Sequence, residues 1–465
     1  MKKSVVLLFA LCAFCLASNA RTVTGSVKSG NKKLSGVIVT DGVGFTKTKS
    51  NGKFTLDIKD DAEFVYLVTP SGYAGDWSTG TPQFYQKTEG KDVFDFDLKQ
   101  LKGGPSYNFI AVGDPQPRKE KHFKEFAGVP LNDMCEHIAS LENQTVGIVL
   151  GDICFDVLPL QESWKKEIPR TGIPFYPVIG NHDHDRQYNN DKEAPGVYRK
   201  NFGPENYAFF LGDDIVIALD NIIYNGRSNY IEGYTDDIIA WVDGLMELVP
   251  QSAAVYVVQH CPLNGRHYTK MVYNYEKMLD ILEGRTVNFV SGHNHTTGNF
   301  EYSETMREHN VAAICGTWWD TYHCTDGTPR GYRVFVKKDG KLTWYYKSIG
   351  RDRNFQFEVY KPGMARLNPE SVVVNVWDYD PCWRIDWYED DVYKGIMKQV
   401  EEYSPLHARD LEAAYKKTGK TPSDYRRTKV AKHYFAAKPS SETTKFTVVV
   451  KDRFGNVWKE DILLK

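Results

Sequence analysis

The chain has 465 residues and a formal net charge of −2 at pH 7, with 25% charged and 41% hydrophobic residues. This length exceeds what one ordinary hydrophobic core supports, so we expect two or three domains. The composition excludes an intrinsically disordered chain. The balanced charge, without a basic stripe, gives no indication of nucleic-acid binding.

The first twenty residues have the features of a secretory signal peptide. Lys2 and Lys3 precede an apolar stretch, residues 5–16, that is too short to span a membrane. Small residues at 18–20 suit cleavage before Arg21. We therefore expect an exported protein, periplasmic or at the cell surface, with a retained membrane anchor as the alternative. No later stretch is long and apolar enough to span a membrane.

Six cysteines follow this segment, and their spacing is irregular, without a CxxC pair. Export permits disulfide bonds, but this spacing indicates neither a zinc ribbon nor a disulfide framework. We expect several of them to be buried free thiols. The six are Cys135, Cys154, Cys261, Cys315, Cys324 and Cys382.

Residues 21–101 have the pattern of a small β-sandwich domain. Residues 22–27 alternate at the period of a strand, and residues 64–68 form a further apolar run. Between them, Asn51-Gly52 is typical of a hairpin turn. The pattern resembles the small β-sandwich modules similar to carboxypeptidase regulatory domains.

Residues 105–350, after a short linker, are expected to form an α/β domain. Short apolar runs separated by helical stretches are typical of buried strands in such a fold, which places its chemistry just beyond the strand ends. A second linker around residues 362–369 precedes a β-rich domain, 365–465, with a helix near residues 410–417. The apolar runs of the α/β domain are residues 109–112, 146–150, 175–179, 255–258, 287–290 and 311–314.

Five polar clusters follow these runs, and together they offer carboxylate and amide oxygens and imidazole nitrogens. Each cluster alone is an ordinary turn or a lone histidine, but five in order make coincidence improbable. Such donors suit first-row divalent metals. The clusters are Asp114-Pro115-Gln116, Gly151-Asp152, Gly180-Asn181-His182-Asp183, His260 and Gly292-His293-Asn294-His295.

This order of motifs resembles the calcineurin-like metallophosphoesterase family, in particular a bacterial exported subgroup with N- and C-terminal accessory β domains. The resemblance implies a four-layer αββα sandwich and two divalent metal ions, Mn, Fe or Zn. It implies Asp114, Gln116 and His295 at the first metal, and Asn181, His260 and His293 at the second. Asp152 would bridge the two, since a carboxylate offsets the repulsion between neighbouring cations.

His182 has a different expected task from the metal ligands around it. A cationic imidazole can stabilise charge on phosphoryl oxygens and protonate the leaving alkoxide. Asp183 is expected to orient that ring; the alternative is a cap or turn residue. His184 and Asp185, which follow, are expected to be solvated.

Two departures from the common family pattern affect this interpretation. Gln116 stands where the pattern has His, and a neutral amide oxygen is a weaker donor, which favours a harder ion such as Mn²⁺ at the first site. The usual G-D-x-x-D is also stretched, because Asp156 lies four residues after Asp152. Whether Asp156 takes the role of the second aspartate is therefore left open.

A tryptophan-rich segment follows the metal motifs and supplies tentative substrate-binding residues. Trp318, Trp319 and His323 lie in a polar, glycine-containing stretch after residues 311–314. Paired tryptophans there can form a substrate wall, or equally pack the C-terminal domain against the α/β domain.

The sequence thus predicts an exported, metal-dependent hydrolase of phosphate mono- or diesters, acting on a phosphorylated small molecule or an envelope component. One alternative is a hydrolase of pyrophosphate bonds in a nucleotide-linked compound. Another is a degenerate phosphoesterase fold whose flanking domains bind glycans or envelope partners. The presence of His182, Asp152 and the Gly-His-x-His motif argues against this last alternative.

Overall fold

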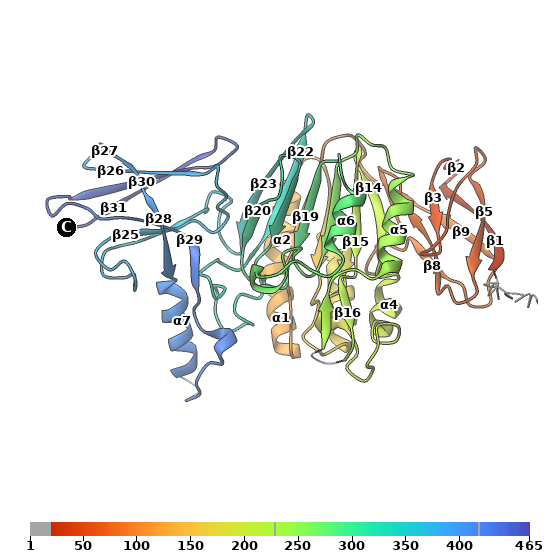
Figure 1. The fold of residues 1–465 in the computed structure, drawn as a ribbon, viewed down its shortest axis with the longest axis horizontal. Helices are drawn as coiled ribbons and strands as arrows, with labels where there is room; N and C mark the ends of the chain where they lie inside the picture. Colours follow the sequence, from red (N-terminus) through yellow and green to blue (C-terminus); the bar gives the residue numbers. More distant parts are fainter. Residues whose placement is uncertain (1–19, 227–228, 417–418) are drawn as a thin grey trace, which may run out of the picture.

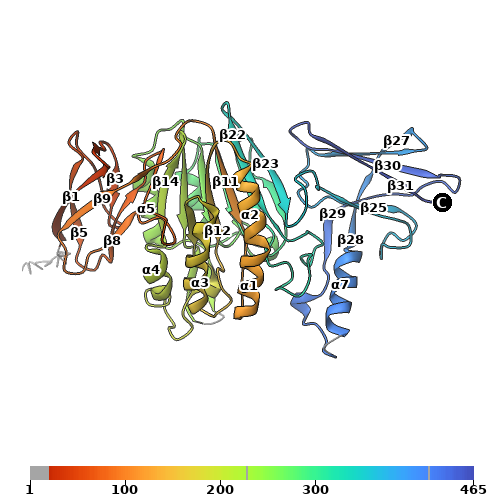
Figure 2. The same cartoon turned by 180° about the vertical axis from the view of Figure 1, so that it is seen from behind.

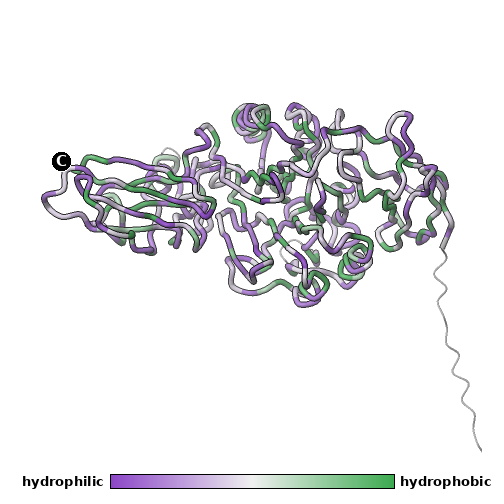
Figure 3. The backbone as a smooth tube through the Cα atoms, turned by 90° about the horizontal axis from the view of Figure 1, so that it is seen from above, coloured by the Kyte–Doolittle hydropathy of each residue, from purple (hydrophilic) through white to green (hydrophobic). Residues whose placement is uncertain are grey.

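The computed structural model describes residues 20–226, 229–416 and 419–465. The expected signal peptide, residues 1–20, lies outside the described residues except for Ala20. Three parts of the chain lie in a row, with the N-terminal strands at one end and the C-terminal strands at the other (Figure 1, Figure 3). Within the described ranges, no helix is both long and apolar enough to cross a membrane.

The N-terminal part consists mainly of two four-stranded sheets. One has β1 in its interior, paired antiparallel with β5 and parallel with β9. Alternate residues of β5 are buried, as the period of a strand requires. The first sheet comprises β1 (Ala20–Ser29), β2 (Lys32–Lys33), β5 (Lys53–Lys59) and β9 (Val93–Asp97). The second comprises β3 (Ile38–Thr40), β4 (Phe45–Lys47), β6 (Phe64–Val68) and β8 (Tyr85–Lys87). A short pair, β7 (Tyr73–Ala74) and β10 (Lys99–Gln100), completes it.

The central part begins with a five-stranded sheet of order β13-β12-β11-β22-β23. The first three strands are parallel, and the β22–β23 hairpin returns antiparallel beside β11. Three of the expected apolar runs therefore lie side by side. The strands are β11 (Tyr107–Val112), β12 (Gln144–Leu150), β13 (Phe175–Val178), β22 (Gly331–Lys338) and β23 (Lys341–Ser348).

A six-stranded sheet of order β14-β15-β18-β19-β21-β20 packs against the first. Its four middle strands are parallel, and they include two more of the expected runs. The strands are β14 (Tyr207–Leu211), β15 (Asp214–Leu219), β18 (Val255–Gln259), β19 (Val287–Ser291), β20 (Gly298–Glu301) and β21 (Met306–Asn310). A separate hairpin, β16 (Ile222–Tyr224) and β17 (Tyr230–Glu232), extends from this sheet.

Helices cover the outer faces of both sheets, which gives the predicted four-layer αββα arrangement (Figure 1, Figure 2). In α5, Ile238, Trp241, Val242 and Leu245 recur at the helical period and face the core, and Thr235 caps the first turn. On the five-stranded sheet lie α1 (Glu120–Gly128), α2 (Pro130–Ala139), α3 (Pro159–Glu167) and α4 (Gly196–Phe202). On the other lie α5 (Asp236–Met246) and α6 (Tyr275–Ile281).

The C-terminal part contains two further four-stranded sheets that enclose their own apolar core. It docks on the central part through Arg333 and Asp378, which form a fully buried ion pair. The strands are β24 (Glu358–Tyr360), β25 (Val372–Asn375), β28 (Lys398–Tyr403) and β29 (Val430–Ala437), then β26 (Arg384–Glu389), β27 (Val392–Ile396), β30 (Lys445–Lys451) and β31 (Val457–Leu463). One helix, α7 (Pro405–Lys416), follows β28.

One expected strand is wrong. Residues 311–314 are buried but lie in a loop, with a single bridge between Ala313 and Gly113. The strand comes earlier, at β21. Its sequence is polar and therefore did not indicate a buried strand, but Glu308 and Asn310 are buried there and form hydrogen bonds. Of the cysteines, four are buried free thiols as predicted, whereas Cys135 is half-buried and Cys382 is exposed.

Candidate active site

The five polar clusters converge at the carboxyl ends of parallel strands from both central sheets. Asp114, Asp152 and Asn181 follow β11, β12 and β13, while His260 and His293 follow β18 and β19. Because parallel strands end at one edge, residues far apart in sequence meet there.

The backbone of these clusters is held in an uncommon conformation. Five of the seven predicted ligands have positive φ angles: Asp114 at 45°, Gln116 at 41°, Asp152 at 52°, His293 at 66° and His295 at 57°. Residues other than glycine avoid this region, and such strain concentrates at functional sites. This conformation occurs in three separate loops that meet at one place. It therefore indicates that the backbone of these loops directs their side chains into a common site.

Asp152 lies at the centre of the site and is almost completely buried. Its carboxylate accepts a hydrogen bond from the backbone N–H of His182 at 2.9 Å and another from the Gln116 amide. It also lies 3.3 Å from Nε2 of His260. Burial alone raises the pKa of a carboxyl, but the charges of His260 and His182 lower that of Asp152 well below its usual range.

Asp152, His260 and His293 form one group of possible metal ligands, whose donor atoms lie within 4.8 Å of one another. Nδ1 of His260 donates to the carbonyl of Leu150 at 2.7 Å, which leaves Nε2 as the ring atom that could bind a metal ion. That Nε2 lies 3.1 Å from Oδ1 of Asn181 and 3.0 Å from Nδ1 of His293.

Asp114, Asp152 and His295 form a second such group, which shares Asp152 with the first. Nε2 of His295 lies 3.3 Å from Oδ1 of Asp114. Neither that Oδ1 nor Oε1 of Gln116 has a hydrogen-bond partner within the described part of the chain, although both are buried. Since buried polar atoms are nearly always paired, these two oxygens fit a cation bound at this group.

Glu232 is a further acid that sequence reasoning missed. It comes from β17, and its Oε1 lies 3.3 Å from Nε2 of His293. A lone glutamate in a polar strand carries no motif, so only the fold brings it beside the ligand.

The expected partnership of His182 with Asp183 is wrong. Nδ1 of His182 lies 2.7 Å from Oδ1 of Asp156, and Phe155 stacks on the imidazole ring at 3.9 Å. Asp156, and not Asp183, is thus the carboxylate that contacts the His182 ring. Its positive φ of 59° turns its side chain toward the ring.

Asp183 instead organises the backbone around the site. Its fully buried carboxylate accepts hydrogen bonds from the N–H groups of Gly180, Ile153 and Cys154, and from the side chain of Gln161. Burial raises its pKa to about 6. These hydrogen bonds fit the alternative interpretation, in which Asp183 is a turn residue.

His184 is also buried, contrary to expectation. Its Nδ1 donates to the carbonyl of Gly180 at 2.9 Å, and its ring stacks on Tyr224 at 4.7 Å. Nε2 lies 3.7 Å from Asp220. His184 therefore supports the turn that carries His182.

A cavity of about 1340 Å³ opens over the two groups of ligands. Trp318 lines it, with its ring 4.7 Å from that of His295. Trp319 does not line the cavity: it donates to the carbonyl of Pro115 at 3.0 Å and packs on the core. Trp318 therefore lies at the cavity, where a substrate wall was expected, whereas Trp319 is a packing residue.

His323 is misassigned as a substrate contact. It is buried away from the cavity, 3.4 Å from Glu358 and 3.7 Å from Asp410. Its ring therefore holds α7 and β24 together.

The layered fold thus brings together two adjoining clusters of carboxylates and imidazoles that share Asp152, and each of them could hold a metal ion. A family model described as calcineurin-like phosphoesterase matches residues 107–297. The model for the N terminal of calcineurin-like phosphoesterase matches residues 21–101, and the model for its C terminal matches residues 308–458. The chain belongs to the calcineurin-like phosphoesterase family, with the N- and C-terminal domains of that family.

Among solved structures, the chain is similar to a dimetal phosphatase from Danio rerio, at 12% identity and a TM-score of 0.39. That match covers 52% of this chain and 96% of the other. A 5'-nucleotidase from Candida albicans SC5314 matches at 11% identity and a TM-score of 0.33, over 52% of each chain. No curated protein matches this chain.

Proposed function

We propose that this protein is a metal-dependent hydrolase of phosphate esters, with His182 as the proton donor to the leaving group. The observation that carries the proposal is the pair of orphaned, buried oxygens on Asp114 and Gln116, beside a carboxylate shared by two groups of ligands. The residues that would hold two divalent ions are Asp114, Gln116, Asp152, Asn181, His260, His293 and His295.

The bound ions would supply charge to the phosphoryl oxygens and a hydroxide nucleophile at neutral pH. The oxygen donors Asp114, Gln116 and Asp152 favour a hard ion such as Mn²⁺ at the first site. Imidazoles dominate the second site, which suits Mn, Fe or Zn equally.

His182 is placed to move a proton at the leaving oxygen. The bond from Nδ1 to Asp156 fixes the ring and leaves Nε2 for a ligand in the cavity, which His182 lines. Asp156 also forms an ion pair with Arg186, so the carboxylate is held from two sides. A positioned general acid of this kind typically contributes about 10²- to 10⁴-fold to the rate.

Hydrolysis of p-nitrophenyl phosphate and of bis-p-nitrophenyl phosphate by Mn²⁺-loaded protein tests the proposal. We expect turnover of at least one of them, lost on chelation and restored by Mn²⁺. Absence of turnover by protein that binds metal would instead favour a degenerate, ligand-binding fold.

We also propose that the protein is exported, on the basis of the basic and apolar segments within residues 1–20. N-terminal sequencing of the protein from a bacterial host tests this. The expected mature chain begins at Arg21; an intact Met1 in the membrane fraction would favour the retained anchor.

A further inference from the structure

The wall of the catalytic cavity carries more positive than negative side chains. Six arginines and lysines line it, against the three acids Asp152, Glu232 and Glu276. Asp152 already belongs to the metal ligands, so it does not balance these cations. The six are Arg118, Arg186, Arg266, Lys270, Lys277 and Arg426.

Three of these cations have a carboxylate partner. Arg186 pairs with Asp156, Lys277 with Asp236 and Arg426 with Asp320. No ion pair is found for the other three, Arg118, Arg266 and Lys270, anywhere in the described ranges. The excess of positive charge therefore faces the cavity.

Arg118 lies next to the catalytic residues. Its guanidinium lies 3.7 Å from the ring centroid of Phe155, which in turn stacks on His182. Nε of Arg118 is buried and has no hydrogen-bond partner among the described residues.

Arg426 reaches the same cavity from the C-terminal part of the chain. It lies in a short 3₁₀ helix, Asp424–Arg426, and its side chain is only 15% exposed. The guanidinium lies 5.6 Å from the ring centroid of Trp318. Burial, followed by the charge of Arg118, lowers the pKa of Arg426, so the two guanidiniums influence each other.

Arg266 extends this positive wall and lies beside Tyr425. The guanidinium of Arg266 lies 5.8 Å from the ring centroid of Tyr425, and both residues line the cavity. Arg266 comes from the central part, whereas Tyr425 and the next residue, the cation Arg426, come from the C-terminal part. Like charges drawn from two parts of the chain are best accommodated when an anion lies between them.

We propose that Arg118, Arg266 and Arg426 form a second anion subsite, so that the preferred substrates are phosphate esters whose leaving group carries a further phosphate or similar anion. This inference rests on the proposed function, in which the metal centre takes the reacting phosphoryl group. Guanidinium forks match phosphate oxygens, and Trp318 and Tyr425 flank the intervening part of the leaving group.

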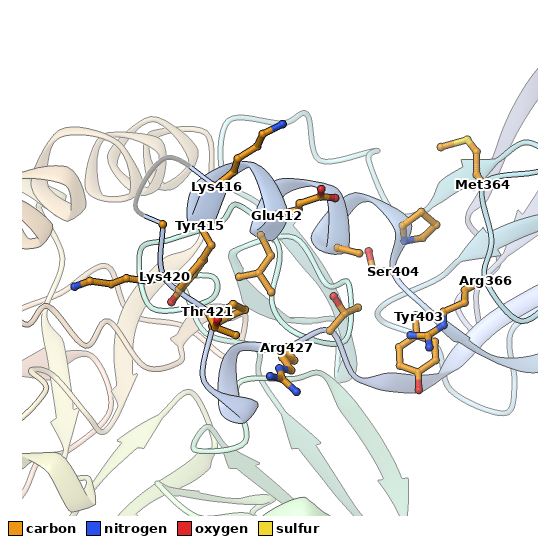
Figure 4. Close-up of a pocket in the computed structure, with 16 residues that line it drawn as sticks. Met364, Arg366, Tyr403, Ser404, Glu412, Tyr415, Lys416, Lys420, Thr421 and Arg427 are labelled. Carbon is orange, nitrogen blue, oxygen red and sulfur yellow. The ribbon is translucent and has the colours of Figure 1, made fainter.

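Arg427 provides a matched control for Arg426. It is the next residue, yet its side chain lines a different cavity, of about 870 Å³, between α7 and its neighbours (Figure 4). It is 58% exposed and pairs with Asp424. Substitution at Arg427 thus changes the same net charge on the same segment without touching the catalytic cavity.

The test compares phenyl phosphate with 4-(phosphonomethyl)phenyl phosphate, which adds one non-hydrolysable anion to the leaving group. We expect the wild-type kcat/KM to favour the second substrate by about tenfold or more. Arg426→Gln is expected to reduce that preference by about tenfold, and Arg427→Gln to leave it unchanged. If Arg426→Gln does not fold, Arg118→Gln carries the same expectation.

Turnover of both substrates without preference by the wild type would overturn the subsite while leaving the phosphoesterase proposal intact. An equal preference in Arg426→Gln and Arg427→Gln would also overturn it. Failure to hydrolyse either substrate or p-nitrophenyl phosphate would contradict the proposed function itself.

Discussion

Two buried carboxylates, Asp114 in the central part and Glu402 in the C-terminal part, show how different polar clusters can be. Both residues have 0% exposure. Glu402 accepts hydrogen bonds from the backbone N–H groups of Arg366, Leu367 and Asn368, at 2.9 to 3.2 Å. Oδ1 of Asp114 has no hydrogen-bond partner within the described residues and lies 3.3 Å from Nε2 of His295, another candidate metal ligand.

The difference teaches how to separate a structural carboxylate from a ligand. A buried charge that serves the fold has its hydrogen bonds satisfied by the protein, as at Glu402. At Asp114 one oxygen lacks a hydrogen bond and the backbone has a φ of 45°, although both features cost stability. Such costs persist where an external group completes the cluster, and we propose that a cation does so at Asp114.

The largest effect is expected from Asp152→Asn, which removes the carboxylate shared by both groups of ligands. Without its charge, two neighbouring cations repel each other and neither group is complete. We expect loss of bound metal, measured by elemental analysis, and turnover below detection. Full metal content in this variant would show that Asp152 does not hold the ions.

The next effect separates His182 from the metal ligands. His182→Ala is expected to retain both ions but lose about 10²- to 10⁴-fold in kcat. Loss of metal from His182→Ala would refute its assignment as proton donor.

Asp156→Asn disturbs the partner of His182 and should cost less, about 10- to 100-fold in activity. Asp183→Asn is the matched comparison, because Asp183 bonds to backbone rather than to the ring. It should chiefly lower the free energy of unfolding, by about 1–3 kcal/mol. An equal rate defect in both variants would restore the role first expected for Asp183.

Glu402→Gln tests the other half of the comparison. One amide NH₂ would face backbone donors, so we expect a loss of about 1–3 kcal/mol in unfolding free energy. Metal content and kcat should stay at wild-type values. A fall in metal content would mean that the contrast between Glu402 and Asp114 is misplaced.

The smallest effect is expected from Gln116→His, which replaces a weak amide donor by imidazole at the first metal group. We expect tighter binding of one ion, measured by competition with a chelator, and little change at the second. Unchanged affinity for both ions would count against the weak-donor argument.

Most of the fold and the meeting of the candidate ligands could be predicted from the sequence, because the buried strands are apolar runs and each is followed by a polar motif. Five of the six apolar runs are strands, and the seven proposed ligands meet at one edge. The run at 311–314 misled because buried loops and buried strands share composition, whereas β21 is polar. Periodicity cannot separate these cases when a buried strand satisfies its polar side chains by hydrogen bonds.

What escaped prediction was which side chains face one another across loops. Adjacency in sequence favoured Asp183 as the partner of His182, but the positive φ of Asp156 directs that carboxylate to the ring. Glu232 and Arg426 belong to no motif and reach the cavity only through the hairpin β16–β17 and the docking of the C-terminal part. Trp318 and Trp319 looked alike, and only tertiary packing separates their environments.

The most direct test of the metal centre is anomalous X-ray diffraction from crystals of the full chain loaded with Mn²⁺. The account predicts two anomalous peaks, one between Asp114, Asp152 and His295 and the other between Asp152, His260 and His293. It also predicts that Oδ1 of Asp114 coordinates the first ion. Crystals loaded with Mn²⁺ that show no peak at either position would contradict the proposed metal centre.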